Sequence, residues 1–193
     1  MSARSVLLFI VACVLVSCGD EPVPKPRSWF RIDLPEQTYT KWEAGGPFTA
    51  EIPAYAVMVQ RKADENAAWY DLRFKQQRAT VHFTWSRVDG DLAELVEDAH
   101  AFKATHEAKA SRMDRERVVR DSARVFGTLF DVEGNVASPF VFYLTDSTSN
   151  FLYGALYFDA APNADSLAPV TQRLREDMRH MVATLAWKPT VAL

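Results

Sequence analysis

The body of the chain begins with short segments in which apolar and polar residues alternate. Within residues 79–87 the apolar side chains of Val81, Phe83 and Trp85 share one face, and the polar side chains between them share the other. A period of two is typical of a half-buried β-strand. The same pattern, interrupted by glycine, proline and polar turns, predicts strands at residues 28–34, 48–52, 55–61, 69–74 and 79–87.

A helical period replaces the alternation after residue 90. Asp91 has the chemistry of an N-cap, Glu94 follows three positions later, and apolar residues then recur along one face. This pattern predicts a helix from residue 92 to about residue 111. A charged connector at residues 112–120 then leads to further strands, predicted at 123–132, 137–145 and 151–158.

The most regular helical periodicity lies near the C-terminus. Asp165 or Ser166 is predicted to cap a helix whose apolar stripe extends to Leu185, with Pro169 tolerated in its first turn. Charged pairs such as Arg173 and Asp177 are expected on its solvent-facing side. The order of strands and helices predicts one α+β domain, an antiparallel sheet with two main helices packed on it.

The N-terminal segment indicates export and lipid attachment. Residues 6–16 form an apolar run after Arg4 that is shorter than the ~20 residues of a membrane-spanning helix, so it is typical of a secretory signal. The end of this run and the two residues after it form Leu15-Val16-Ser17-Cys18, which resembles the lipobox of bacterial lipoproteins. We expect a signal peptide at residues 1–17 and acyl chains such as palmitate on Cys18. The alternative is an ordinary cleavage site in which Cys18 is only a small residue.

The remaining boundaries follow from composition. Proline occupies every second position from Pro22 to Pro26, which favours an extended polyproline II spacer. We therefore predict a lipid-anchored linker at residues 18–27, a globular domain at 28–188 and a tail at 189–193. A body of this length suits a single domain.

Charge and cysteine content narrow the range of functions. The net charge is −3 and no basic cluster is present, which argues against nucleic acid as a partner. The two cysteines, Cys13 and Cys18, leave none in the body for a disulfide, a zinc site or a catalytic thiol. His100 and His106 lack the i,i+4 spacing of a zinc-binding helix, and no nucleotide, phosphate or nucleophile-elbow motif occurs. We expect no enzyme activity, metal or cofactor.

Two polar loops bracket the strand predicted at 137–145. Asn135 and Ser138 lie in the first, and Asp146, Ser147 and Thr148 lie in the second. Turn formation accounts for these residue types, because they form hydrogen bonds with local backbone. We also treat them as candidate interaction loops. Catalysis by Asp146 and Ser147 would need a base within reach, and the sequence indicates none.

Several motifs, in order along the chain after Cys18, carry a resemblance to a known family. They are Lys25-Pro26-Arg27-x-x-Phe30-Arg31-Ile32-Asp33-Leu34-Pro35, Gly134-Asn135-Val136-Ala137-Ser138, Phe142-x-Leu144-Thr145-Asp146-Ser147-Thr148, Phe151-Leu152-x-Gly154-Ala155-Leu156-Tyr157-Phe158, Pro162-Asn163-x-Asp165-Ser166-Leu167-Ala168-Pro169-Val170, Leu174-Arg175-Glu176-Asp177 and Leu185-x-Trp187-Lys188. Together they resemble the gliding motility lipoprotein GldD family of the Bacteroidota. The order of strands and helices also resembles the Mog1/PsbP-type α/β/α sandwich, at the level of the fold alone.

The resemblance implies a non-enzymatic, lipid-anchored protein of the gliding motility and type IX secretion machinery that acts through protein–protein contacts. It implies a periplasmic body held at the inner or outer membrane, with the membrane protein GldE as a candidate partner, and it carries over no catalytic residue. Exported proteins of that phylum can be O-glycosylated at Asp-Ser or Asp-Thr motifs. Ser122 and Ser147 are therefore candidate O-glycosylation residues.

A second function class is an envelope module that binds a small ligand or glycan. In that case Trp42, Trp69, Trp85 or Tyr153 would serve as stacking platforms. A binding module predicts a concave pocket lined by aromatic and convergent polar groups. An assembly protein needs only an exposed apolar patch.

Overall fold

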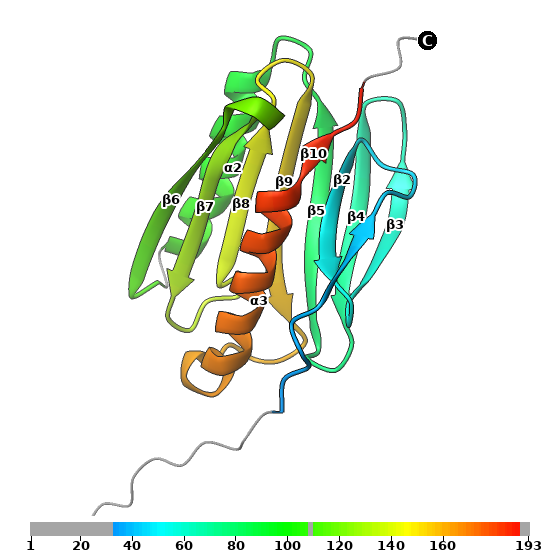
Figure 1. Ribbon diagram of the computed structural model, residues 1–193. Helices are drawn as coiled ribbons and strands as arrows, with labels where there is room; N and C mark the ends of the chain where they lie inside the picture. Colours follow the sequence, from blue (N-terminus) through cyan, green and yellow to red (C-terminus); the bar gives the residue numbers. More distant parts are fainter. Residues whose placement is uncertain (1–32, 108–109, 190–193) are drawn as a thin grey trace, which may run out of the picture. The chain divides into compact units, whose positions relative to one another are not determined.

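The computed structural model describes residues 33–107 and 110–189 (Figure 1). Its helices and strands are β1 (Tyr39–Trp42), β2 (Phe48–Pro53), β3 (Val57–Ala63), β4 (Ala67–Phe74), β5 (Ala79–Arg87), α2 (Leu92–Glu107), β6 (Arg112–Arg120), the 3₁₀ helix η1 (Asp121–Ala123), β7 (Val125–Glu133), β8 (Phe140–Thr145), β9 (Asn150–Phe158), α3 (Ala164–Thr184) and β10 (Ala186–Trp187). The predicted signal peptide, Cys18, the linker at 18–27 and tail residues 190–193 lie outside the described residues.

The fold is built on a seven-stranded antiparallel sheet with the strand order β3-β4-β5-β9-β8-β7-β6. It consists of two meanders, β3 to β5 and β6 to β9, which α2 connects along the chain. Pairing of β5 with β9 joins them, with Ala79 opposite Phe158 and Arg87 opposite Asn150. A smaller sheet has the order β1-β2-β10 and is also antiparallel. The predicted α+β class is confirmed.

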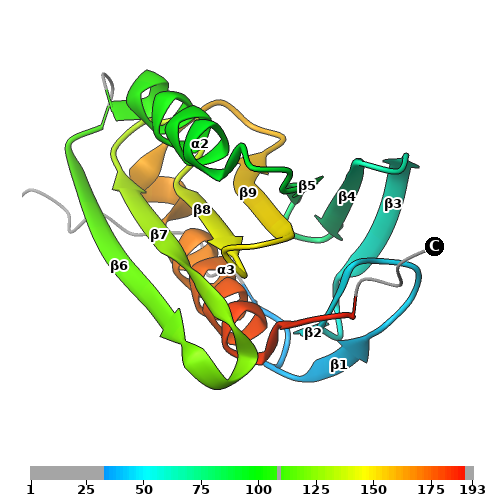
Figure 2. The same cartoon turned by 90° about the horizontal axis from the view of Figure 1, so that it is seen from above.

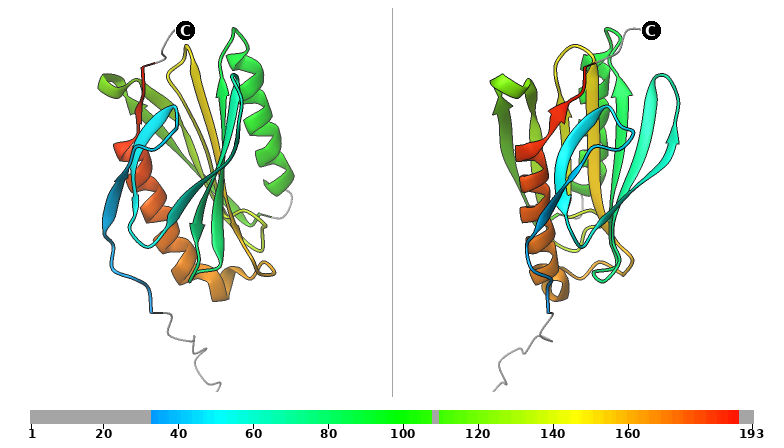
Figure 3. Two further views of the ribbon diagram at one scale, coloured as in Figure 1. Left: turned by 90° about the vertical axis from the view of Figure 1, so that its right-hand side faces the viewer. Right: turned by 45° about the vertical axis from the view of Figure 1, so that its right-hand side comes forward.

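The two long helices lie on opposite faces of the large sheet (Figure 2). α2 contacts β8 and β9 on one face, whereas α3 and the small sheet cover the other, where α3 packs against β2 (Figure 3). The main core fills the space between the sheet and α3. Phe83, Phe142, Leu174 and Met178 are at most 1% exposed there. Within the described residues, no helix combines the length and apolar character needed to cross a membrane.

Most predicted elements are present with shifted ends. The strand predicted at 79–87 is β5, those at 48–52 and 151–158 are β2 and β9, and the strands expected at 55–61 and 69–74 are β3 and β4. The strands expected at 123–132 and 137–145 begin later, as β7 and β8. The helix expected to reach residue 111 ends at Glu107.

One prediction at the edge of the large sheet is wrong. Residues 112–120 form the edge strand β6 and not a connector. Their charged side chains reach solvent because an edge strand has little cover, and Val118 is the residue of β6 that is buried. Most of the strand expected at 28–34 lies outside the described residues, and its described part, residues 33 and 34, has no regular structure.

The prediction that Asp177 faces solvent is also wrong. Asp177 is completely buried, and the hydroxyl groups of Tyr39 and Tyr55 donate hydrogen bonds to its two carboxylate oxygens. These tyrosines are more than 120 residues away in sequence. The helical period assigned Asp177 to a polar face, but it could not show that the small sheet covers that face.

Candidate functional site

The candidate site lies where the β7–β8 loop meets the first turn of α3. β7 ends at Glu133, and the chain turns through Gly134, whose φ of 109° is a conformation that glycine adopts without steric cost. The N–H of Val136 donates to the Gly134 carbonyl at 2.9 Å, and the Ser138 hydroxyl donates to the Phe140 carbonyl at 3.2 Å. These contacts give the loop a defined shape and leave Asn135 exposed.

The start of α3 is joined to this loop by side-chain amides. Asn163 is the N-cap, and its side chain accepts a hydrogen bond from the N–H of Ser166 at 3.1 Å. Asn135 Oδ1 accepts from the N–H of Ala164 at 2.9 Å. The predicted caps, Asp165 and Ser166, are wrong because both residues are already helical, whereas a cap residue must precede the helix. Pro169 likewise lies beyond the first turn.

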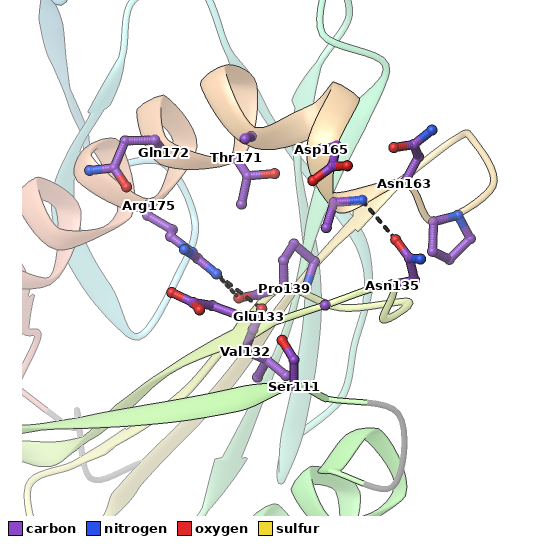
Figure 4. A pocket seen from close by; sticks show the side chains of 14 residues that line it. Ser111, Val132, Glu133, Asn135, Pro139, Asn163, Asp165, Thr171, Gln172 and Arg175 are labelled. Carbon is purple, nitrogen blue, oxygen red and sulfur yellow. Dashed lines mark hydrogen bonds between the residues drawn. The ribbon is translucent and has the colours of Figure 1, made fainter. Parts of the chain in front are cut away.

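A cavity of about 720 Å³ opens between the loop and the helix (Figure 4). Its walls come from Ser111, which precedes β6, from the end of β7 and the loop after it, and from the first turns of α3 with the residues before them. The lining residues are Ser111, Val132, Glu133, Gly134, Asn135, Pro139, Pro162, Asn163, Ala164, Asp165, Ala168, Thr171, Gln172 and Arg175.

Arg175 fixes the wall of this cavity. Its guanidinium donates to the carbonyls of Val132 at 3.0 Å and Pro139 at 2.9 Å, so that α3 holds both sides of the β7–β8 loop (Figure 4). Its Nε lies 3.0 Å from Asp131 Oδ1. Burial lowers the pKa of Arg175, and the negative charges of Asp131 and Glu133 act in the opposite direction. The guanidinium stays charged at neutral pH.

A second arginine extends this network. Arg179 Nε donates to Glu116 at 2.9 Å, and its guanidinium also pairs with Asp131. Burial opposes the charged form of Arg179, but hydrogen bonds to Glu116 and Asp131 outweigh it and raise the pKa. One carboxylate on β7 thus binds two arginines one helical turn apart. The network fixes the position of α3 relative to the β6–β7 hairpin.

The lining is suited to recognition by hydrogen bonds. Glu133 and Asp165 supply carboxylates, and Asn135, Asn163 and Gln172 supply amides. Ser111 and Thr171 contribute hydroxyl-bearing side chains. Together these side chains provide both donors and acceptors for polar groups of a ligand or partner.

The second predicted interaction loop lies at the other end of β8 (Figure 1). Asp146 Oδ1 accepts from the N–H groups of Thr148, Ser149 and Asn150 at 2.7–2.9 Å, and Asp146 Oδ2 accepts from the Asn150 amide at 2.8 Å. Desolvation opposes ionisation of Asp146, but these hydrogen bonds outweigh it and lower the pKa. Asp146 therefore shapes the loop. Ser147 and Thr148 are exposed at its tip, with Ser147 at a φ of 67°.

Ser138 belongs to the β7–β8 loop, whereas the remaining predicted residues lie elsewhere in the chain. Ser138 is fully buried, which removes it from the surface that a partner could contact. Ser122 is exposed in η1, and Cys18 and the side chain of His106 lie outside the described residues. His100 packs against the rings of Phe130 and Tyr143. No group of metal-ligating side chains is present in the described part of the chain.

The four predicted stacking platforms are dispersed, and none lines the cavity. Trp42 packs against Phe48 and Tyr70, and Trp85 packs against the core and donates to Asn150 Oδ1 at 3.0 Å. Lys62 covers the ring of Trp69, with its Nζ 5.3 Å from the ring centroid. Tyr153 lines a separate cavity of about 280 Å³ beside α2. Of the four, Tyr153 is therefore placed where a ring could contact a ligand in a cavity.

Sequence patterns missed Arg175 and Gln172 as lining residues. Their spacing on a regular helix is that of solvent-facing positions, and nothing local indicates that a loop about 40 residues earlier folds over them. The one available signal was the resemblance itself. Its Gly134–Ser138 and Pro162–Val170 motifs are distant in sequence but form opposite walls of the same cavity.

No curated protein matches the chain. The family model described as gliding motility lipoprotein GldD matches residues 19–187, which include every element of the fold and both walls of the cavity. The chain therefore belongs to the gliding motility lipoprotein GldD family.

Proposed function

We propose that this lipoprotein serves the gliding motility machinery and the associated type IX secretion system through protein–protein contacts at the rim of the β7–β8 cavity. One observation carries the proposal. Two motifs of the family resemblance, separated by more than 20 residues, are brought together at this rim, where Asn135 Oδ1 binds the N–H of Ala164 at 2.9 Å. The Arg175 contacts keep the rim rigid, which lowers the entropy cost of binding a partner.

The rim offers polar groups to a partner. Glu133 and Asn135 are exposed, and Gln172 Nε2 donates to Glu176 at 2.8 Å on the adjoining helix face. GldE is the candidate partner that the family resemblance implies. Attachment at Cys18 would confine the domain to a layer close to the membrane and raise its effective concentration toward membrane proteins.

Replacement of Glu133 tests the proposal in cells. Glu133→Arg reverses an exposed charge on the cavity wall, and Glu97→Arg makes the same change on an exposed position of α2. We expect Glu133→Arg to abolish spreading and secretion with normal protein abundance, and Glu97→Arg to leave both intact. Normal gliding of the Glu133→Arg strain would contradict the role of this rim.

A test of Cys18 addresses the anchor separately. Cys18→Ala removes the thiol that would carry the acyl chains, so the protein should stay unacylated. Mass spectrometry of the N-terminal peptide measures the acylation directly. The expected result is loss of both acylation and gliding. An unmodified N-terminal peptide in the parent strain would contradict lipid attachment.

Binding of a small ligand or glycan is the second candidate function. The cavity volume of about 720 Å³ falls within the range of ~300–1,000 Å³ typical of ligand sites, and its lining is polar. Calorimetry of the full chain against envelope glycans would separate the two functions. Saturable glycan binding that Gln172→Ala weakens would favour the binding module.

Ser122 and Ser147 are proposed O-glycosylation residues. Both side chains are exposed in the structure, as attachment of a sugar requires. Intact-mass measurement of the protein from its own cells, compared with Ser122→Ala and Ser147→Ala, tests each residue.

A further inference from the structure

A second concave surface lies on the opposite face of the large sheet, beside α2. This groove has a volume of about 430 Å³ and runs between α2 and the outer strands β6 and β7. It shares no lining residue with the cavity at the β7–β8 loop. Figure 2 shows β6 and β7 extending beyond α2 on this side.

The floor of the groove is apolar and aromatic. Residues of β6, β7 and β8 that alternate along their strands turn the same face toward α2, with Val119 opposite Phe126 and Thr128 opposite Tyr143. Val119 is 49% exposed and is one of two large hydrophobic residues with such exposure among those described. Val96 of α2 forms the facing wall. Together these residues give the groove an apolar surface that is open to solvent at Val119.

Two arginines border this floor. Arg115 and Arg117 occupy the same face of β6, and the strand geometry places them about 7 Å apart. Both are exposed, and in the described part of the chain no carboxylate pairs with either guanidinium. Their neighbours differ, because Arg112 pairs with Asp114 at 2.9 Å and Glu116 pairs with Arg179 at 2.9 Å.

Unpaired guanidinium groups beside an apolar floor are complementary to a ligand that carries both carboxylates and apolar groups. We propose that this groove binds an acidic segment of a partner protein, whose carboxylates pair with Arg115 and Arg117 and whose apolar side chains lie on Val119, Phe126 and Tyr143. Two carboxylates on alternate residues of an extended segment have the same spacing of about 7 Å. Arg also forms bidentate hydrogen bonds with carboxylates, which fixes the orientation of the segment.

This surface goes beyond the proposed cavity rim and does not depend on it. Peptide binding to the purified protein tests the groove, whereas gliding of the Glu133→Arg strain tests the rim of the β7–β8 cavity. Failure of one therefore leaves the other unaffected.

The test uses the full chain in detergent and short fluorescent peptides that carry two glutamates followed by two leucines on alternate residues, with serine between them, so that all four side chains share one face of the extended peptide. Glutamine–leucine and lysine–leucine peptides of the same length serve as probes of charge. We expect saturable binding of the glutamate peptide that weakens with added salt and is about tenfold or more weaker in Arg115→Glu/Arg117→Glu. The double variant should instead bind the lysine peptide, which also shows that the groove is still folded.

Arg112→Glu is the matched control, because Arg112 is an exposed arginine of the same strand that lies outside the groove. Its affinity for the glutamate peptide should stay within about twofold of the parent chain. Equal binding of the glutamine peptide, equal loss in Arg112→Glu, or no saturable binding would overturn the proposal. Binding of anionic vesicles through Arg115 and Arg117 without peptide binding would assign the groove to lipid and also overturn it.

Discussion

The hydroxyl of Tyr39 donates a 3.0 Å hydrogen bond to the fully buried carboxylate of Asp177. Tyr55 donates to the other oxygen of the same carboxylate. Nearby, the ring of Tyr39 stacks on the ring of His180, with 3.6 Å between their centroids. His180 Nε2 lies 2.6 Å from Glu51 Oε2. These contacts join β1, β2 and the turn after β2 to α3, and so attach the small sheet to the rest of the domain.

Asp177→Leu is expected to destabilise the domain by about 2–4 kcal/mol. The substitution leaves two tyrosine hydroxyls without their acceptor, and a buried donor left without a partner costs about 1–3 kcal/mol. The apolar leucine side chain offsets part of this cost, because it is buried at the same position. Tyr39→Phe removes one of the two and should cost about half as much. Urea unfolding measures both changes. A cost below about 1 kcal/mol for Asp177→Leu would show that the small sheet is held by apolar packing instead.

Stability should fall in alkaline solution. Burial, followed by the hydrogen bond to Asp177, raises the pKa of Tyr39 to about 12, and the same causes raise the pKa of Tyr55 further. An unfolded tyrosine ionises near pH 10, so the unfolded state loses protons first and the free energy of unfolding decreases as pH rises from about 10 to 12. Unfolding curves at stepped pH measure this, and Tyr39→Phe should reduce the slope. An unchanged slope in the Tyr39→Phe variant would show that Tyr39 does not cause the loss of stability at alkaline pH.

Local pattern predicted much of the fold, because most strands and both helices bury one face. β5 matches its predicted range because Val81 and Phe83 are almost fully buried, while His82 between them faces solvent. β6 was missed because an edge strand with only Val118 buried has no apolar alternation to detect. The strand order was also inaccessible, since pairing of β5 with β9 joins residues about 70 positions apart.

The site was less predictable than the fold. Asn135 and Asp146 were recognised as loop residues, since their side chains bind local backbone, but their different roles depend on distant contacts. Arg175 and Asp177 looked alike as polar residues of a helix. Each proved to bind groups at least 36 residues away, and such partners leave no periodic trace in the sequence.

Arg175→Met should destabilise the domain by about 2–4 kcal/mol and loosen the β7–β8 loop. The change removes the side-chain donor to the Val132 carbonyl and one of the two donors to the Pro139 carbonyl, which also accepts from the N–H of Val132 at 2.9 Å. It also removes one of the two cations beside Asp131. Urea unfolding gives the energy, and hydrogen exchange at residues 132–139 gives the loop dynamics. Arg175→Lys should rescue little, because one ammonium cannot reach all three oxygens. Full rescue by lysine would contradict a role in positioning the loop.

Gly154→Ala should destabilise by about 1–3 kcal/mol. A Cβ at this position would lie 2.4 Å from the Phe142 ring, which is itself fully buried and cannot move aside. The double variant Gly154→Ala/Phe142→Leu tests the cause, because the smaller side chain makes room for the added methyl group. We expect its cost to be clearly less than the sum of the two single costs. Strict additivity would show that backbone freedom, and not the ring, requires glycine here.

Asn163→Ala distinguishes the observed cap of α3 from the caps that the sequence predicted. The Asn163 side chain accepts from the N–H of Ser166, and its loss should cost about 1 kcal/mol. Ser166 lies inside the first turn and is not the cap, so Ser166→Ala should change the free energy of unfolding by less than about 0.5 kcal/mol. Thermal and urea unfolding of the two variants under the same conditions compare them directly. If Ser166→Ala costs more than Asn163→Ala, the helix begins later than Ala164, and the amide bridge from Asn135 to Ala164 cannot hold the cavity wall.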